Sequence, residues 1–177
     1  MPQSVFGLPL HPLIVHATVV IVPLAALLVL LSAVWPRARR WAGPLPLALA
    51  VAGLVLDPLS TSSGENLERQ VSGNALIEKH AQLADGLLPW MVALVVAAGC
   101  VYAWHWRAQR RDEHVSRTTR PWLPIVLSGL AVVAALGTVV QVVLIGHSGA
   151  KAAWSDVAAQ SQSSQSSQSS QSSKSLQ

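Results

Sequence analysis

Residues 13–35 read LIVHATVVIVPLAALLVLLSAVW, and this stretch decides the fold class of the chain. The run contains no charged residue, and its only polar interruptions are His16, Thr18 and Ser32. At about 1.5 Å per residue, a helix of this length crosses a hydrocarbon core of roughly 30 Å. The stretch therefore predicts a transmembrane helix.

Three more apolar runs predict further spans, at residues 44–60, 82–104 and 122–146. The second of these is the shortest and carries Asp57 near its end. Because lipid offers no hydrogen bonds, a spanning segment must satisfy its backbone internally, which favours helices. We expect an all-α integral membrane protein in which residues 1–154 form a four-helix bundle.

Composition supports this fold class and excludes several functions. Only 11% of the 177 residues are charged and 51% are hydrophobic, whereas soluble domains carry roughly 25% charged residues. The single cysteine, Cys100, excludes an internal disulfide, a Cys-ligated iron–sulfur cluster and the attachment motif of a c-type haem. Nucleotide-binding and hydrolase motifs are absent, and no nucleophile with an adjacent base can be named, which favours a non-enzymatic role.

Residues 155–177 form a separate segment that repeats Gln-Ser-Ser. Such a segment has nothing to bury, so we expect a disordered low-complexity tail.

Basic residues predict the orientation. The connections after the first and third spans hold eight of the twelve Lys and Arg residues, namely Arg37, Arg39, Arg40, Arg107, Arg110, Arg111, Arg117 and Arg120. By the positive-inside rule both connections are cytoplasmic, and both termini are extracytoplasmic. The net charge of +4 then anchors the protein to anionic lipid, and nucleic-acid binding is not predicted. The N-terminus lacks a basic region and a cleavage site before its apolar run, so we expect the first helix to stay as a span.

Small residues at four-residue spacing would let the helices approach closely. The alternative is that the spacing arises by chance, because alanine is common in this chain. The pairs are Ala48 with Ala52, Ala93 with Ala97, and Ala131 with Ala135.

This topology brings four histidines to the extracytoplasmic face: His11, His16, His80 and His147. The two remaining histidines, His105 and His114, fall in or beside the cytoplasmic arginine-rich loop, where we expect solvated interfacial side chains. The connection from Ser60 to Lys79 could be a lid over the four histidines, but its Ser/Thr/Gly-rich start favours a plain turn out of the membrane.

Several imidazoles at one end of a helical bundle favour metal ligation. Imidazole suits haem iron, copper and zinc, and a ligating histidine usually passes its second ring proton to a carboxylate or carbonyl group. The candidate ligands are His11, His16, His80 and His147, and the candidates for supporting them are Asp57, Glu65, Asp85 and Gln141. A b-type haem needs two such histidines and an apolar slot. Two alternatives stay open: a proton relay, and histidines that only form hydrogen bonds at helix ends.

The stretch GLPLHPLIVH (residues 7–16), His80, and GHSGA (residues 146–150) resemble a widespread bacterial family of small predicted membrane proteins of unknown function. The resemblance implies a four-helix bundle in the bacterial plasma membrane, with the four histidines named above as recurrent positions. Some members are joined to a Rieske iron–sulfur domain, which implies a Rieske-type redox partner.

The sequence thus favours a membrane protein that binds haem b, or copper or zinc, at the extracytoplasmic face and transfers electrons. The alternative is a non-catalytic accessory or assembly subunit without a cofactor. The oligomeric state is not predicted.

Overall fold

The computed structural model describes residues 4–5, 8–68, 75–111 and 122–174, with side chains described for residues 13–66, 75–108, 110 and 122–155. A two-residue antiparallel ladder, β1 (Ser4–Val5) with β2 (Leu8–Pro9), precedes the helices. All other regular elements are helices, and they are α1 (Leu10–Val34), α2 (Pro36–Ala42), α3 (Leu45–Glu68), α4 (Ala75–Asp85), α5 (Leu87–Arg111) and α6 (Trp122–Lys174).

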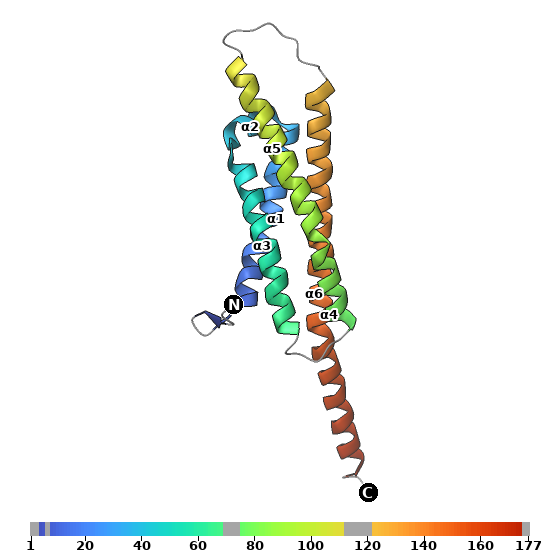
Figure 1. Ribbon diagram of the computed structural model, residues 1–177. Coiled ribbons are helices and arrows are strands. Elements are labelled where there is room, and N and C mark those ends of the chain that lie inside the picture. The colour runs from blue at the N-terminus through green and yellow to red at the C-terminus, as the bar shows by residue number, and fades with distance from the viewer. Residues whose placement is uncertain (1–3, 6–7, 69–74, 112–121, 175–177) are drawn as a thin grey trace.

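The four long helices form an antiparallel bundle (Figure 1). Helix α1 packs against α3 and α6, and α5 packs against the same two helices, so the four form a closed ring. Short α4 continues the line of α5 and packs against α6. We call the end that contains α4 the His80 end, and the end that contains α2 the Arg39 end.

Within the described residues, four segments are long and apolar enough to cross a membrane: Leu13–Val34, Leu45–Asn66, Ala75–Ala108 and Trp122–Ser155. The predicted all-helical fold with four spans is therefore confirmed. Which end faces the cytoplasm stays a prediction from the arginine distribution.

The bundle keeps its small side chains inside and its large ones outside. Its core contains Ala25, Ala26, Ala50, Ala98, Ala131, Ala134 and Ala135, together with Val22, Val29, Met91 and Leu94. Large aliphatic side chains such as Val20, Val96 and Leu130 are exposed. This distribution is typical of membrane bundles, because lipid solvates large apolar side chains while small residues allow the helices to pack closely.

Of the three alanine pairs, only Ala131 and Ala135 are both buried. Ala48 and Ala93 are exposed instead. Spacing alone did not fix which face of each helix turns inward.

The second connection differs from the sequence prediction. Residues 60–68, expected to be a turn, continue α3 as helix. The hydroxyl groups there donate to carbonyl oxygens three residues back, from Ser62 to Leu59 at 3.2 Å and from Ser63 to Ser60 at 2.8 Å. Serine favours turns because it can bond to nearby backbone, but here the same bonds form within the helix.

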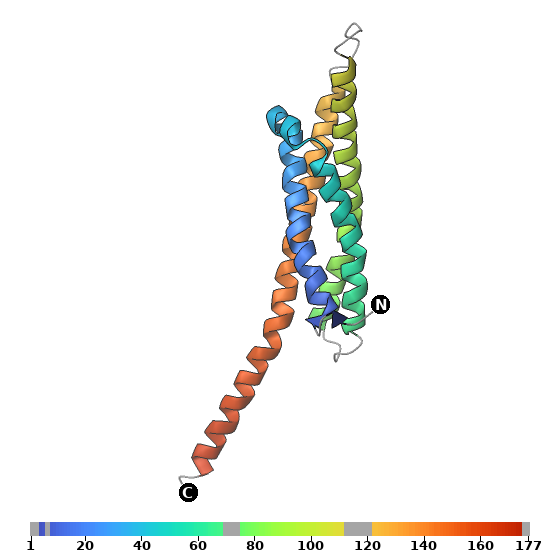
Figure 2. The same ribbon diagram turned by 90° about the vertical axis from the view of Figure 1, so that its left-hand side faces the viewer.

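Helix α6 also continues beyond the bundle, to Lys174 (Figures 1 and 2). In both views this extension points away from the other helices. Tertiary packing stabilises most protein helices, and an isolated one is marginal in water. Disorder of residues 155–177 in solution therefore stays a prediction.

One close contact joins α5 to α6. A Cβ added to Gly137 would collide with the indole ring of Trp90, whereas a Cβ at Gly129 on the same helix would meet nothing within 4 Å. The ring of Trp90 thus requires a glycine opposite it.

We expect Gly137→Ala to destabilise the bundle by about 1 to 3 kcal/mol, because overpacking forces Trp90 or the helices apart. Gly129→Ala is the matched control and should be neutral or slightly stabilising, since alanine favours helix. Thermal unfolding of the two variants in detergent measures the difference. Equal melting temperatures for both variants would contradict the contact.

Candidate functional site

His80 forms contacts with two groups of α6 at the His80 end. It lies half-buried on α4 and faces α6. Its Nδ1 lies 3.0 Å from Oγ of Ser148 and 3.2 Å from the carbonyl oxygen of Ile145. The side chain therefore fastens α4 to α6.

These contacts decide which ring nitrogen carries the proton. The hydroxyl of Ser148 donates to the carbonyl oxygen of Ile145 at 2.9 Å, so its oxygen can only accept from the ring. The carbonyl oxygen can also only accept. Nδ1 of His80 must therefore be protonated, and in the neutral ring Nε2 carries the lone pair.

Gly149 makes room for the ring. A Cβ at Gly149 would lie 2.9 Å from Cε1 of His80 and 3.2 Å from Nδ1, closer than ordinary contacts allow. Residues 146–149 (GHSG) thus form the binding surface for the ring of His80, which we call the seat of His80: Ser148 accepts a hydrogen bond and Gly149 provides space. Both roles were missed from the sequence, because GHSGA (residues 146–150) was used only for its resemblance to a family.

Gln141 donates a hydrogen bond to a backbone carbonyl group close to the point where the helix is interrupted. Helix α4 ends at Asp85 and α5 begins at Leu87, because Pro89 lacks an N–H and its ring clashes with the carbonyl four residues earlier. The side-chain Nε2 of Gln141 donates to the carbonyl oxygen of Leu83 at 2.6 Å. A side chain at Gly86 would obstruct this bond, since its Cβ would lie 2.7 Å from Nε2 of Gln141.

The other predicted ligands lie on helices at the same end, and the two whose side chains are described are exposed. His16 on α1 and His147 on α6 are exposed. His147 precedes Ser148 by one residue, which turns it about 100° around the helix from the side that meets His80. His11 lies in α1, but its side chain is outside the described residues.

The predicted supporting carboxylates are divided between the interior and the surface. Asp57 is buried in α3, with 3% of its surface exposed. Asp85 is exposed and acts electrostatically on Asp57. Glu65 is exposed. Among the side chains that the structure describes, no group of three or more His, Cys, Asp and Glu residues is placed to hold a metal ion.

The hydroxyl groups of two threonines at this end form hydrogen bonds within their own helices. The hydroxyl of Thr18 donates to the carbonyl oxygen of Ile14 at 2.9 Å, and that of Thr138 donates to the carbonyl oxygen of Ala134 at 2.8 Å. Such bonds are the usual solution for a hydroxyl inside an apolar bundle. His80 and Ser148 are different, because they connect two helices.

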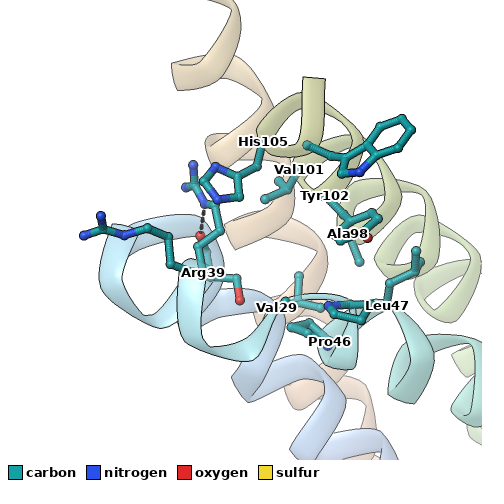
Figure 3. Close-up of a pocket in the computed structure, with 13 residues that line it drawn as sticks. Val29, Arg39, Pro46, Leu47, Ala98, Val101, Tyr102 and His105 are labelled. Atoms are coloured by element: carbon teal, nitrogen blue, oxygen red, sulfur yellow. Dashed lines mark hydrogen bonds between the residues drawn. The ribbon is translucent and has the colours of Figure 1, made fainter. Parts of the chain in front are cut away.

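The prediction that His105 is a solvated side chain holds only in part. The residue is half-buried, its Nε2 is buried, and it lines a cavity at the Arg39 end (Figure 3). Arg39 lines the same cavity, which was not visible in the sequence because its lining comes from four separate segments, the end of α1, α2, the start of α3 and α5. His114 lies outside the described residues.

Comparison with curated proteins and with solved structures found no match. The family described as predicted membrane protein (DUF2231) matches residues 7–162, which include all four spans and the seat of His80. The chain therefore belongs to the DUF2231 family of membrane proteins, as its sequence resemblance predicts.

Proposed function

We propose that this protein is an electron-transfer protein of the membrane, in which Nε2 of His80 ligates haem b or a metal ion at the extracytoplasmic end. One observation carries the proposal: the hydrogen bonds from Nδ1 of His80 to Ser148 and to the carbonyl oxygen of Ile145. Metal-ligating histidines almost always donate their second ring N–H to a carboxylate, carbonyl or water, which fixes the ring and raises its basicity. His80 already has this arrangement.

Haem iron fits His80 better than zinc does. The porphyrin supplies four ligands to the iron, so the protein needs to supply one or two. Zinc sites use three or four protein ligands, and copper sites in proteins commonly use three. His80 contributes one nitrogen, and a second axial ligand would come from His11, His16 or His147, which the fold brings to the same end.

Electron transfer is the role that suits such a group here. A haem with both axial positions filled by histidine has no open position for substrate, and its chemistry is the transfer of one electron. A redox partner on the extracytoplasmic side, such as a Rieske-type protein, would be its donor or acceptor. In the alternative, an accessory subunit without a cofactor, the contacts of Nδ1 would serve only to fasten α4 to α6, and Nε2 of His80 would have no role.

We expect the full chain, purified in detergent from haem-supplied cells, to show a Soret band and a reduced α-band. His80→Ala should abolish both bands, because the iron loses its fixed ligand. Lys79→Ala is the control, since Lys79 is the exposed neighbour of His80 on α4. A colourless protein without iron, copper or zinc by elemental analysis would overturn the proposal, and so would bands that survive His80→Ala.

Ser148 should tune the site through His80. We expect Ser148→Ala to weaken haem or metal binding by about tenfold, because loss of such a supporting hydrogen bond typically costs 10–100-fold in affinity. Ser155→Ala is the matched control: Ser155 lies on the same helix, and its hydroxyl donates to the carbonyl oxygen of Ala152 at 2.9 Å, also three residues back. Titration of the apoprotein with haem measures the affinities. Equal affinities for the two variants would exclude a role for the His80–Ser148 bond.

A further inference from the structure

A cavity of about 170 Å³ lies at the Arg39 end, between the end of α1, α2, the start of α3 and α5 (Figure 3). Among the residues that the structure describes, none that lines it is Asp or Glu. Its lining includes six residues with hydrogen-bonding side chains, namely Ser32, Arg39, Arg40, Tyr102, His105 and Trp106. The cavity is therefore positively charged and rich in donors.

Two buried polar atoms of residues in this lining have no hydrogen-bond partner within the described part of the chain: Oγ of Ser32 and Nε2 of His105. Ser32 is 6% exposed, and it comes from α1, whereas His105 comes from α5. Buried polar groups in folded proteins are normally paired, so two such atoms, in residues from two helices that line one cavity, indicate a polar guest.

The arginines supply the charge that such a guest would neutralise. Nε of Arg39 donates to the carbonyl oxygen of Ser32 at 2.6 Å, and Nη2 donates to that of Ala33 at 2.9 Å, which ties α2 to the end of α1. These bonds use two of the five N–H groups of the guanidinium. Burial lowers the pKa of Arg39, because desolvation penalises its charge. Both Arg39 and Arg40 act electrostatically on His105.

Exposed tryptophans surround this end of the bundle. Trp35, Trp41, Trp106 and Trp122 are each at least 44% exposed. Tryptophan is enriched where a membrane meets water, at the level of the lipid headgroups. The cavity thus lies at the depth where phosphate groups of lipids are found.

We propose that this cavity binds a phosphate group, which accepts hydrogen bonds from Arg39, Arg40, Ser32 and His105. Arginine pairs with phosphate through two parallel hydrogen bonds, and phosphate oxygens can accept the further donors. The cavity is smaller than the roughly 300 Å³ of the smallest drug-sized pockets, which suits a phosphate or headgroup and not a larger ligand. The phosphate belongs either to an anionic lipid or to free inorganic phosphate.

Two measurements on the full chain in detergent distinguish these sources. In the first, native mass spectrometry follows retention of phosphatidylglycerol in competition with phosphatidylcholine. In the second, the melting temperature of delipidated protein is compared in inorganic phosphate and in chloride at equal ionic strength. Preferential retention of phosphatidylglycerol supports a lipid headgroup, and stabilisation by phosphate alone supports the free ion. Absence of both effects overturns the proposal.

Arg40→Gln tests the site with a matched control. Arg40 lines the cavity and has no role in capping α1, whereas Arg37 carries the same charge on the same helix and does not line the cavity. We expect Arg40→Gln to weaken the observed binding at least about tenfold, because it removes charge-assisted hydrogen bonds. Arg37→Gln should change it little. Equal losses in both variants would show attraction to general surface charge and would overturn the proposal.

Ser32→Ala separates binding from folding. Because Oγ of Ser32 has no hydrogen-bond partner among the described residues, its removal should leave the melting temperature of the ligand-free protein unchanged or raise it. The same variant should bind phosphatidylglycerol or phosphate several-fold more weakly. A variant with unchanged binding would show that the hydroxyl does not meet the ligand and would contradict the proposed donor set.

Discussion

Every backbone polar group inside a bilayer must find a partner without water, and this requirement determines what most polar side chains of the bundle do. Where Pro89 breaks the line of α4 and α5, Gln141 donates to the carbonyl oxygen of Leu83. Where α1 ends, Arg39 donates to the carbonyl oxygens of Ser32 and Ala33. Thr18 and Thr138 bond to their own helices. The two proposed sites, at His80 and in the cavity, rest on polar groups that these backbone bonds leave available, such as Nε2 of His80 and Oγ of Ser32.

The spans could be predicted because length and composition are local properties of the sequence. The run at residues 13–35 and the span Leu13–Val34 differ by one residue. The boundary after Asp57 could not be predicted in the same way, because serine and threonine serve both turns and helices. Their hydroxyl groups bond to carbonyl oxygens within α3, and the helix therefore continues to Glu68.

The candidate site was predictable in part. Antiparallel spans alternate in direction, so the sequence could bring His16, His80 and His147 to one end. It could not give the rotation of each helix about its axis, which decides that Ser148 meets His80 while His147 is exposed. The same limit applies to His105: its position beside an arginine-rich loop predicted a solvated ring, but the residue is half-buried and lines a cavity together with Arg39 and Arg40 of α2.

The two sites are chemically separate because of the core between them. The buried residues midway along the bundle are apolar and include Val22, Ala26, Met91 and Leu94. Among the described residues, the buried polar ones lie towards the His80 end, as Thr18, Asp57, Thr138 and Ser148, or at the Arg39 end, as Ser32. Proton paths in membranes use chains of polar and ionisable groups, so this core disfavours the proton relay considered from the sequence. A redox group on His80 would accordingly exchange electrons with partners at its own end, while a phosphate bound at the opposite end would fix the position of the bundle in the membrane.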